Sequence, residues 1–126
     1  MELYRQGIDA VNRHDLDGVI AVLDPAVEWI ARLAGVEGRV KGHDGVRTWW
    51  TDQYEAFETI QIDLQEVVDG GDWVVATGTT QVQGGESGVP LEVPLAQATR
   101  WRNRKCIHLE SFPTKAEALE AAGLSE

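Results

Sequence analysis

Residues 42–50, GHDGVRTWW, contain the side chains of this chain whose types could act on a small molecule. His43 could serve as a general base in a pocket mouth, because an imidazole accepts and returns a proton near pH 7. It could also be a loop histidine before a helix, where the positive end of the helix dipole disfavours its charged form. Trp50 and Tyr54 are four residues apart, so on a helix they share a face and stack.

The tryptophans of this stretch have two interpretations. Trp49 and Trp50 cannot point the same way, since neighbouring helix positions differ by about 100°. We expect Trp50 to reach a ligand and Trp49 to lie in the core. With Trp29 and Trp101, Trp50 and Tyr54 could form an aromatic box for a flat apolar ligand. The same set is an equally good hydrophobic core, and aromatic walls alone bind without catalysing.

The sequence lacks the motifs for nucleophilic catalysis, phosphate binding and metal binding, and its carboxylates are accounted for by structural roles. There is no Ser-His-Asp arrangement, glycine-rich phosphate loop or metal-ligand cluster. A single cysteine, Cys106, excludes an internal disulfide and a multi-cysteine metal site. Among the carboxylates, Asp44 is expected to cap a helix, and Glu28 to face outward because it alternates with Trp29. We therefore expect no metal and no cofactor.

The charge of the chain excludes whole classes of partner. The formal net charge is −10, and the sequence pI is about 4.6. Phosphate backbones repel such a protein, so nucleic acid and anionic membrane are not expected partners. No stretch approaches the roughly 18 apolar residues that a membrane span needs. The N-terminus lacks the pattern of a signal peptide, and the single cysteine suits a reducing setting, so we expect a cytoplasmic protein.

Hydrophobic periodicity predicts helices at the start and the end of the chain. Apolar residues at helical spacing favour a first helix over residues 3–12, followed by a short one capped by Asp15. Residues 34–42 are punctuated by glycine and are expected to form a loop before the third helix. At the other end, Thr114 opens a capping box with Glu117, and Gly123 closes the last helix.

Period-two patterns predict the strands between these helices. We expect strands at residues 27–30, from residue 59 onward, and at 73–82, 91–101 and 106–112. This order predicts a single α+β domain over residues 1–126, with a curved antiparallel sheet wrapped around the N-terminal helices. Such a cone leaves an internal pocket between sheet and helices. Small residues around Gly78 suggest that the pocket is not completely filled.

Several segments carry a family resemblance. NRHDLDGVIAVLDPAVEW, GHDGVRTWW, ESGVPLEV and TKAEALEAAGL, in this order, resemble the SnoaL-like branch of the nuclear transport factor two-like superfamily. That superfamily includes steroid isomerases and polyketide-cyclase-like proteins. The resemblance covers nearly the whole chain and implies a cone-shaped α+β fold, usually a homodimer packed through the outer face of its sheet. It does not imply one function, because members range from cyclases and isomerases to proteins without known chemistry.

The steroid-isomerase pattern can be laid along the chain residue by residue. Its carboxylate base falls on Trp29, which cannot take a proton. Its tyrosine donor falls at about Gly7, with Tyr4 one turn earlier. Its protonated aspartate falls on Gln97, which could still donate a hydrogen bond to a carbonyl. Without the base, steroid isomerisation is unsupported.

If Gln97 faces inward, the period of two divides the last two predicted strands into two faces. The inward face then holds Leu95, Thr99, Trp101, Ile107, Leu109 and Ser111. The outward face holds His108 with Arg100 and Glu110, and we interpret it as dimer interface or solvated surface. A catalytic His108 would require the opposite register.

These inferences define one site with two possible functions. The ligand-binding residues are expected to be Trp29, Trp50, Tyr54, Gln97, Trp101 and Leu109. The ligand is a small apolar or carbonyl-containing molecule, in particular a flat apolar carbonyl compound. An enzyme of this kind would perform cofactor-free isomerisation, cyclisation or dehydration, with Gln97 orienting the carbonyl and His43 or Tyr54 assisting. The alternative is a non-catalytic ligand-binding or dimerisation module that has lost the family's carboxylate.

Overall fold

The computed structural model describes residues 2–33, 36–84 and 88–124. The helices of this part of the chain are α1 (Glu2–Asn12), α2 (Leu16–Ala21), α3 (Gly42–Ala56) and α4 (Lys115–Ala121). The strands are β1 (Leu23–Leu33), β2 (Val36–Lys41), β3 (Thr59–Asp69), β4 (Trp73–Gln83), β5 (Leu91–Arg102) and β6 (Lys105–Ser111). The α+β class is therefore confirmed.

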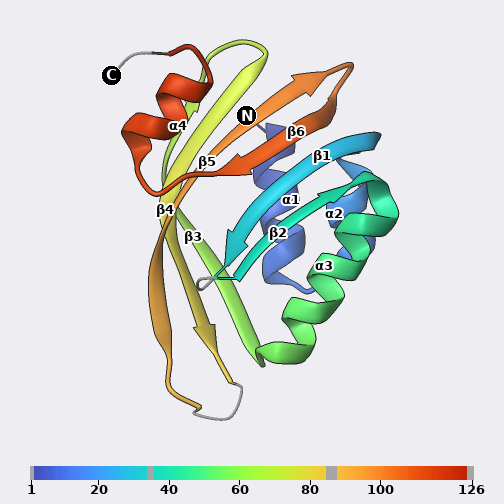
Figure 1. Cartoon of the computed structure of the whole chain (residues 1–126), viewed down its shortest axis with the longest axis vertical. Coiled ribbons are helices and arrows are strands. Elements are labelled where there is room, and N and C mark those ends of the chain that lie inside the picture. The colour runs from blue at the N-terminus through green and yellow to red at the C-terminus, as the bar shows by residue number, and fades with distance from the viewer. Residues whose placement is uncertain (1, 34–35, 85–87, 125–126) are drawn as a thin grey trace.

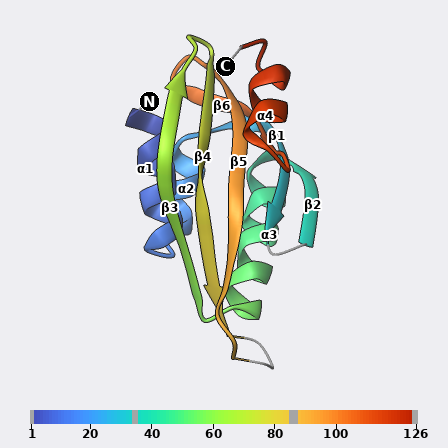
Figure 2. The ribbon, with the colours of Figure 1, turned by 90° about the vertical axis from the view of Figure 1, so that its left-hand side faces the viewer.

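The six strands form one sheet in the order β2-β1-β6-β5-β4-β3. Neighbouring strands are antiparallel except β1 and β6, which run parallel. The sheet is strongly curved, with α1, α2 and α3 on its concave side (Figure 1). Helix α4 lies on the opposite, outer side, beside β4 and β5 (Figure 2). The expected curved sheet around N-terminal helices is confirmed, apart from the one parallel pair that forms where the last strand returns beside the first.

The first two helices follow the predicted pattern. Helix α1 buries Tyr4, Ile8 and Val11, which recur at helical spacing and face the sheet. Helix α2 is capped by Asp15, whose carboxylate accepts a hydrogen bond from the backbone N–H of Gly18 at 3.0 Å. This contact satisfies one of the unpaired N–H groups at the start of the helix.

The glycine-rich segment before α3 is a strand, so the predicted loop over residues 34–42 is wrong for the part that the structure describes. Strand β2 pairs with β1 in antiparallel register, with Lys41 opposite Glu28. The glycine at position 38 is explained by packing: a Cβ atom there would collide with the indole of Trp49. Gly38 therefore marks a close approach between a strand and a side chain.

Helix α3 begins earlier than predicted. Lys41 is its N-cap residue and makes no side-chain capping bond, so the predicted cap at Asp44 is wrong. Because β2 runs directly up to Lys41, the chain turns into the helix at Gly42, whose φ of 78° favours glycine. Asp44 lies in the first turn, where its negative charge suits the helix dipole.

A β-bulge interrupts the pairing of β5 with β6. Thr99 pairs with Leu109 and Arg100 with His108, but Trp101 pairs with Cys106. Ile107 is the additional residue. It lines a groove on the outer side of the sheet together with His108, so its predicted inward position is wrong. Cys106 faces inward instead, because a bulge shifts the alternation of one strand by one residue.

Two apolar clusters stabilise the fold. The larger lies between the concave face of the sheet and α1, α2 and α3. The smaller packs α4 on the outer face through small side chains such as Ala96, Ala98 and Ala118. Helix α4 starts as predicted, with the Thr114 hydroxyl accepting from the backbone N–H of Glu117 at 3.2 Å. Within the described ranges, none of the helices has the length and apolar character that crossing a membrane requires.

Candidate ligand cavity

A cavity of about 50 Å³ lies between the concave face of the sheet and the N-terminal helices. Of the residues predicted to bind a ligand, the structure places in its wall Trp29, Trp50, Gln97, Trp101 and Leu109. They come from β1, α3, β5 and β6, so elements from both halves of the chain meet here. The wall also contains Trp49, which we expected to lie only in the core.

The polar centre of the cavity is a hydrogen-bonded pair, Tyr4 and Gln97. The Tyr4 hydroxyl donates to Oε1 of Gln97 at 2.9 Å, and both side chains are buried. Burial raises the pKa of Tyr4 well above its ordinary value, and the nearby Cys106 adds to the shift. Tyr4 therefore stays a neutral hydrogen-bond donor.

Sequence reasoning missed Tyr4 as a site residue. The partners are 93 positions apart, so no local pattern joins them. The available signal was the position of Tyr4 one turn from the tyrosine of the steroid-isomerase pattern. A shift of one helical turn keeps a side chain on the same face, and that is where Tyr4 meets Gln97.

Four tryptophan rings share the remaining wall with a larger number of aliphatic side chains. Trp29 and Trp50 meet edge to face, with ring centroids 6.3 Å apart and an interplanar angle of 74°. Trp50 stacks on Tyr54 at 5.5 Å and 25°, which confirms the contact predicted from their spacing. The Trp101 indole N–H donates to Oγ1 of Thr99 at 2.7 Å. Edge-to-face and stacked pairs of this kind rigidify a pocket wall.

Three indole N–H groups at the cavity are unpaired. Nε1 of Trp29, Trp49 and Trp50 is buried and has no hydrogen-bond partner in the described ranges. A buried donor without an acceptor costs about 1–3 kcal/mol. These residues all line the cavity, and each carries an indole donor that the described part of the protein leaves unpaired.

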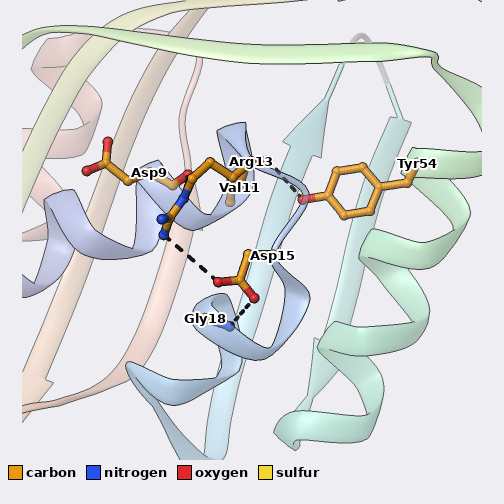
Figure 3. A network of polar contacts seen from close by, with 6 residues as sticks. All are labelled: Asp9, Val11, Arg13, Asp15, Gly18 and Tyr54. Carbon is orange, nitrogen blue, oxygen red and sulfur yellow. Dashed lines mark hydrogen bonds and ion pairs between the residues drawn. The ribbon is translucent and has the colours of Figure 1, made fainter.

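Tyr54 was predicted to bind the ligand, but it lies outside the cavity wall. Its hydroxyl donates to the backbone carbonyl of Val11 at 3.1 Å, at the end of α1 (Figure 3). Its ring also stacks on His14, with centroids 4.2 Å apart. Burial, with a smaller effect from Asp15, raises the pKa of Tyr54 to about 12. Tyr54 thus joins α3 to α1 as a neutral phenol.

His43 also lies away from the cavity wall. Its Nε2 atom is 2.8 Å from the backbone carbonyl oxygen of Leu23. A carbonyl only accepts hydrogen bonds, so Nε2 must carry the proton. The structure therefore brings His43 to the start of β1 and separates it from Gln97, which it was predicted to assist.

A model of one protein family matches most of this chain. It is described as the SnoaL-like domain, and it matches residues 4–109. The chain belongs to the SnoaL-like family. A comparison with curated proteins found no match.

Solved structures with the same fold resemble this SnoaL-like chain over nearly its whole length. An NTF2-like protein of unknown function from Burkholderia pseudomallei has a TM-score of 0.81 at 25% identity, covering 95% of this chain and 94% of that one. A putative polyketide cyclase from Sinorhizobium meliloti has 0.74 at 17%, covering 89% and 94%. A protein with a ketosteroid isomerase-like fold from Catenulispora acidiphila, in complex with trimethylamine, has 0.81 at 14%, covering 98% and 94%.

The SnoaL-like cavity has few titratable groups in its described wall. They are Tyr4, Arg32 and Cys106. The Cys106 thiol donates to the backbone carbonyl of His108 at 3.3 Å, and burial raises its pKa to about 12, so it is not a thiolate near neutral pH. His108 faces the outer groove and approaches Oε1 of Glu110 at 3.2 Å, in agreement with the predicted register. The wall thus supplies hydrogen-bond donors and one cation.

Proposed function

We propose that this protein binds a small, mostly apolar molecule with a carbonyl oxygen inside the tryptophan-lined cavity. The Tyr4–Gln97 pair carries this proposal, because it is a buried polar contact in a wall made mostly of aliphatic and aromatic side chains. Apolar walls favour burial of a ligand by about 25 cal/mol per Å² of apolar surface. A few fixed polar groups then orient it.

The carbonyl oxygen of the ligand would accept the hydrogen bond that the Tyr4 hydroxyl now donates to Oε1 of Gln97. Gln97 can itself donate through Nε2, which has only a long contact of 3.5 Å to the Ser111 hydroxyl. A ligand carbonyl at this place would therefore meet two neutral donors, the Tyr4 hydroxyl and Nε2 of Gln97.

Binding without catalysis is the function that these groups support best. Neutral donors such as Tyr4 and Gln97 can stabilise an oxyanion, which isomerisation, cyclisation and dehydration all require. Those reactions also need a group that accepts a proton. In the described wall, Tyr4 and Cys106 are held protonated by burial and Arg32 is a cation, so none of them accepts one. We therefore favour the module that has lost the family's carboxylate.

The volume of the cavity limits the size of the ligand. Sites for drug-sized ligands occupy about 300–1,000 Å³, whereas this cavity has about 50 Å³. A cavity that holds one benzene ring has about 150 Å³, so any ring requires the wall to open, and a fused polycyclic compound requires the larger movement. We propose a ligand with a single ring, such as an aryl ketone.

Calorimetric titration with butyrophenone, a single-ring ketone, tests the proposal. We expect binding by the wild-type protein and a loss of about tenfold in affinity in Tyr4→Phe, since one hydrogen bond to the carbonyl disappears. Tyr54→Phe is the matched control, because it removes a phenol outside the cavity wall. Equal affinities for Tyr4→Phe and wild type would contradict the proposal.

We further propose a cytoplasmic homodimer that associates through the outer face of β5 and β6. The support is an open groove there that exposes Trp73, Ile107 and His108. Sedimentation should give about twice the chain mass of 13.9 kDa, and Ile107→Glu should shift it toward one chain mass. A wild-type protein of one chain mass would refute the dimer.

A further inference from the structure

A groove opens in the sheet where β6 ends. Strand β6 pairs with β5 only as far as Ser111 opposite Gln97, whereas β5 begins six residues earlier, at Leu91. On the other side β1 continues past its pairing with β6 to Arg32 and beyond. Figure 1 shows β4 and β5 extending well below the level at which β6 ends. A groove of about 180 Å³ occupies the space, with Arg32, Leu95, Ser111 and Phe112 among its walls.

The groove continues the ligand cavity. Arg32 and Leu95 line both of them. The Ser111 hydroxyl oxygen accepts from the backbone N–H of Arg32 at 3.3 Å and from Nε2 of Gln97 at 3.5 Å. A line of polar groups therefore runs from Tyr4 through Gln97 and Ser111 to the backbone N–H of Arg32. A ligand longer than the cavity has a path along this line.

The Arg32 side chain borders the groove and has donors to spare. Along β1, Trp29 and Ala31 face the cavity, so Arg32 points to the outer side of the sheet, as Glu28 does. The Arg32 side chain is 52% exposed, and its contact with Glu37 is long, at 3.7 Å, to a carboxylate that is equally exposed. Exposed ion pairs of this kind are weak and are screened by salt. The planar guanidinium has a geometry that matches a carboxylate through two parallel N–H donors.

The surrounding charge favours an anion at this junction. The chain has 21 acidic residues and 11 basic ones, but the described walls of cavity and groove contain neither aspartate nor glutamate. Glu37 is the acid that faces Arg32 from β2. Glu110, next to Ser111, is held by His108 on the outer side. In both hydrogen bonds of the Ser111 hydroxyl its oxygen accepts, so its own proton is available to a ligand.

We propose that the ligand is an apolar oxo acid, whose carboxylate binds Arg32 and Ser111 at the junction while its ring and keto group occupy the cavity. Arg32 is then the residue that selects an acid over a neutral ketone. The inference rests on the proposed binding of a carbonyl compound at Tyr4 and adds a second, charged point of recognition.

The test uses two probes of the same shape, β-benzoylpropionate and phenacylacetone, in which a methyl ketone replaces the carboxylate. Calorimetry should show that the wild-type protein binds the acid about tenfold more tightly, as a charge-assisted pair would give. Arg32→Gln should remove this preference without weakening phenacylacetone, and Arg32→Lys should keep part of it. Arg39→Gln is the matched control, because it removes the same charge from β2 outside both walls.

The outcomes separate this inference from the proposed function. Equal binding of the two probes by the wild-type protein, or an unchanged preference in Arg32→Gln, would overturn the role of Arg32. Tyr4-dependent binding of butyrophenone would meanwhile leave the carbonyl site intact. If neither butyrophenone nor the two probes bind, both the inference and the proposed function fail.

Discussion

Neighbouring residues of β5 meet two different environments. Thr99 faces the cavity side, where its hydroxyl donates to the backbone carbonyl of Val74 and accepts from Trp101. Arg100, the next residue, faces outward and lies over the ring of Trp73, with its Cζ atom 5.9 Å from the ring centroid. The polar groups of Thr99 and Trp101 inside are neutral and pair with one another, whereas Arg100 outside is charged and partly solvated. The same side-chain type should therefore carry a different energetic weight on each face.

The largest difference in stability loss between the inner and outer faces should come from replacing a tryptophan by alanine. Trp50→Ala removes a buried ring from the inner face and is expected to lower the free energy of unfolding by about 3–5 kcal/mol. Trp73→Ala, on the half-buried outer side, should cost about 1 kcal/mol, since its contacts with Arg100 and His108 are partly solvated. Urea denaturation measures both. Equal losses would show that the two faces do not differ in this way.

Ionisation of the buried Cys106 thiol should have an intermediate effect on the free energy of unfolding, and this effect depends on pH. Burial raises the pKa of Cys106 from its ordinary value of 9.0 to about 12. The stabilisation from the neutral thiol is complete below about pH 9 and is lost as the pH rises toward about 12, because only the unfolded thiol ionises in that window. We expect this group to reduce the free energy of unfolding by about 1.4 kcal/mol per pH unit there.

Urea melts of the wild type and Cys106→Ala at several pH values between about 8 and 11 check this effect. The variant should be less stable at the lower end, where the thiol fills its site, and should lose stability less steeply as the pH rises. Parallel pH profiles would mean that the thiol is not protected from ionisation by the fold.

The smallest effect is expected on the outer face. Glu110→Gln removes the charge that faces His108, in a pair whose side chains are 24% and 33% exposed. Such a partly solvated pair contributes about 0–1 kcal/mol, so thermal or urea denaturation should show little change near neutral pH. A loss of several kcal/mol would place this pair in the same class as the inner-face contacts.

Local signals predicted most of the fold. The caps at Asp15 and Thr114 depend on residues within one turn, and the structure has both. Strand β2 was missed because Gly38 is required by a ring that packs on it from α3, which sequence spacing does not show. Ile107 was misplaced because alternation counted from Gln97 assumes an unbroken register, and the bulge breaks it.

The candidate site was predicted less completely, for a related reason. The aromatic part of the wall follows from residue type and the family resemblance, and the stacking of Trp50 on Tyr54 follows from their spacing. The role of a polar group depends on which atom it meets across the fold. Tyr4 meets Gln97, whereas His43 meets a backbone carbonyl of β1, and neither partner is near in sequence.

The contact between Trp49 and Gly38 links the cavity to the edge of the sheet. Strand β2 is an edge strand, and exposed edges carry unpaired N–H and C=O groups that can join another chain. The Trp49 indole lies in the cavity wall and rests on β2 at Gly38, while Glu37 and Arg39 place exposed charges along the strand. A substitution that loosens the contact between Trp49 and Gly38 would therefore release β2 for pairing with another chain.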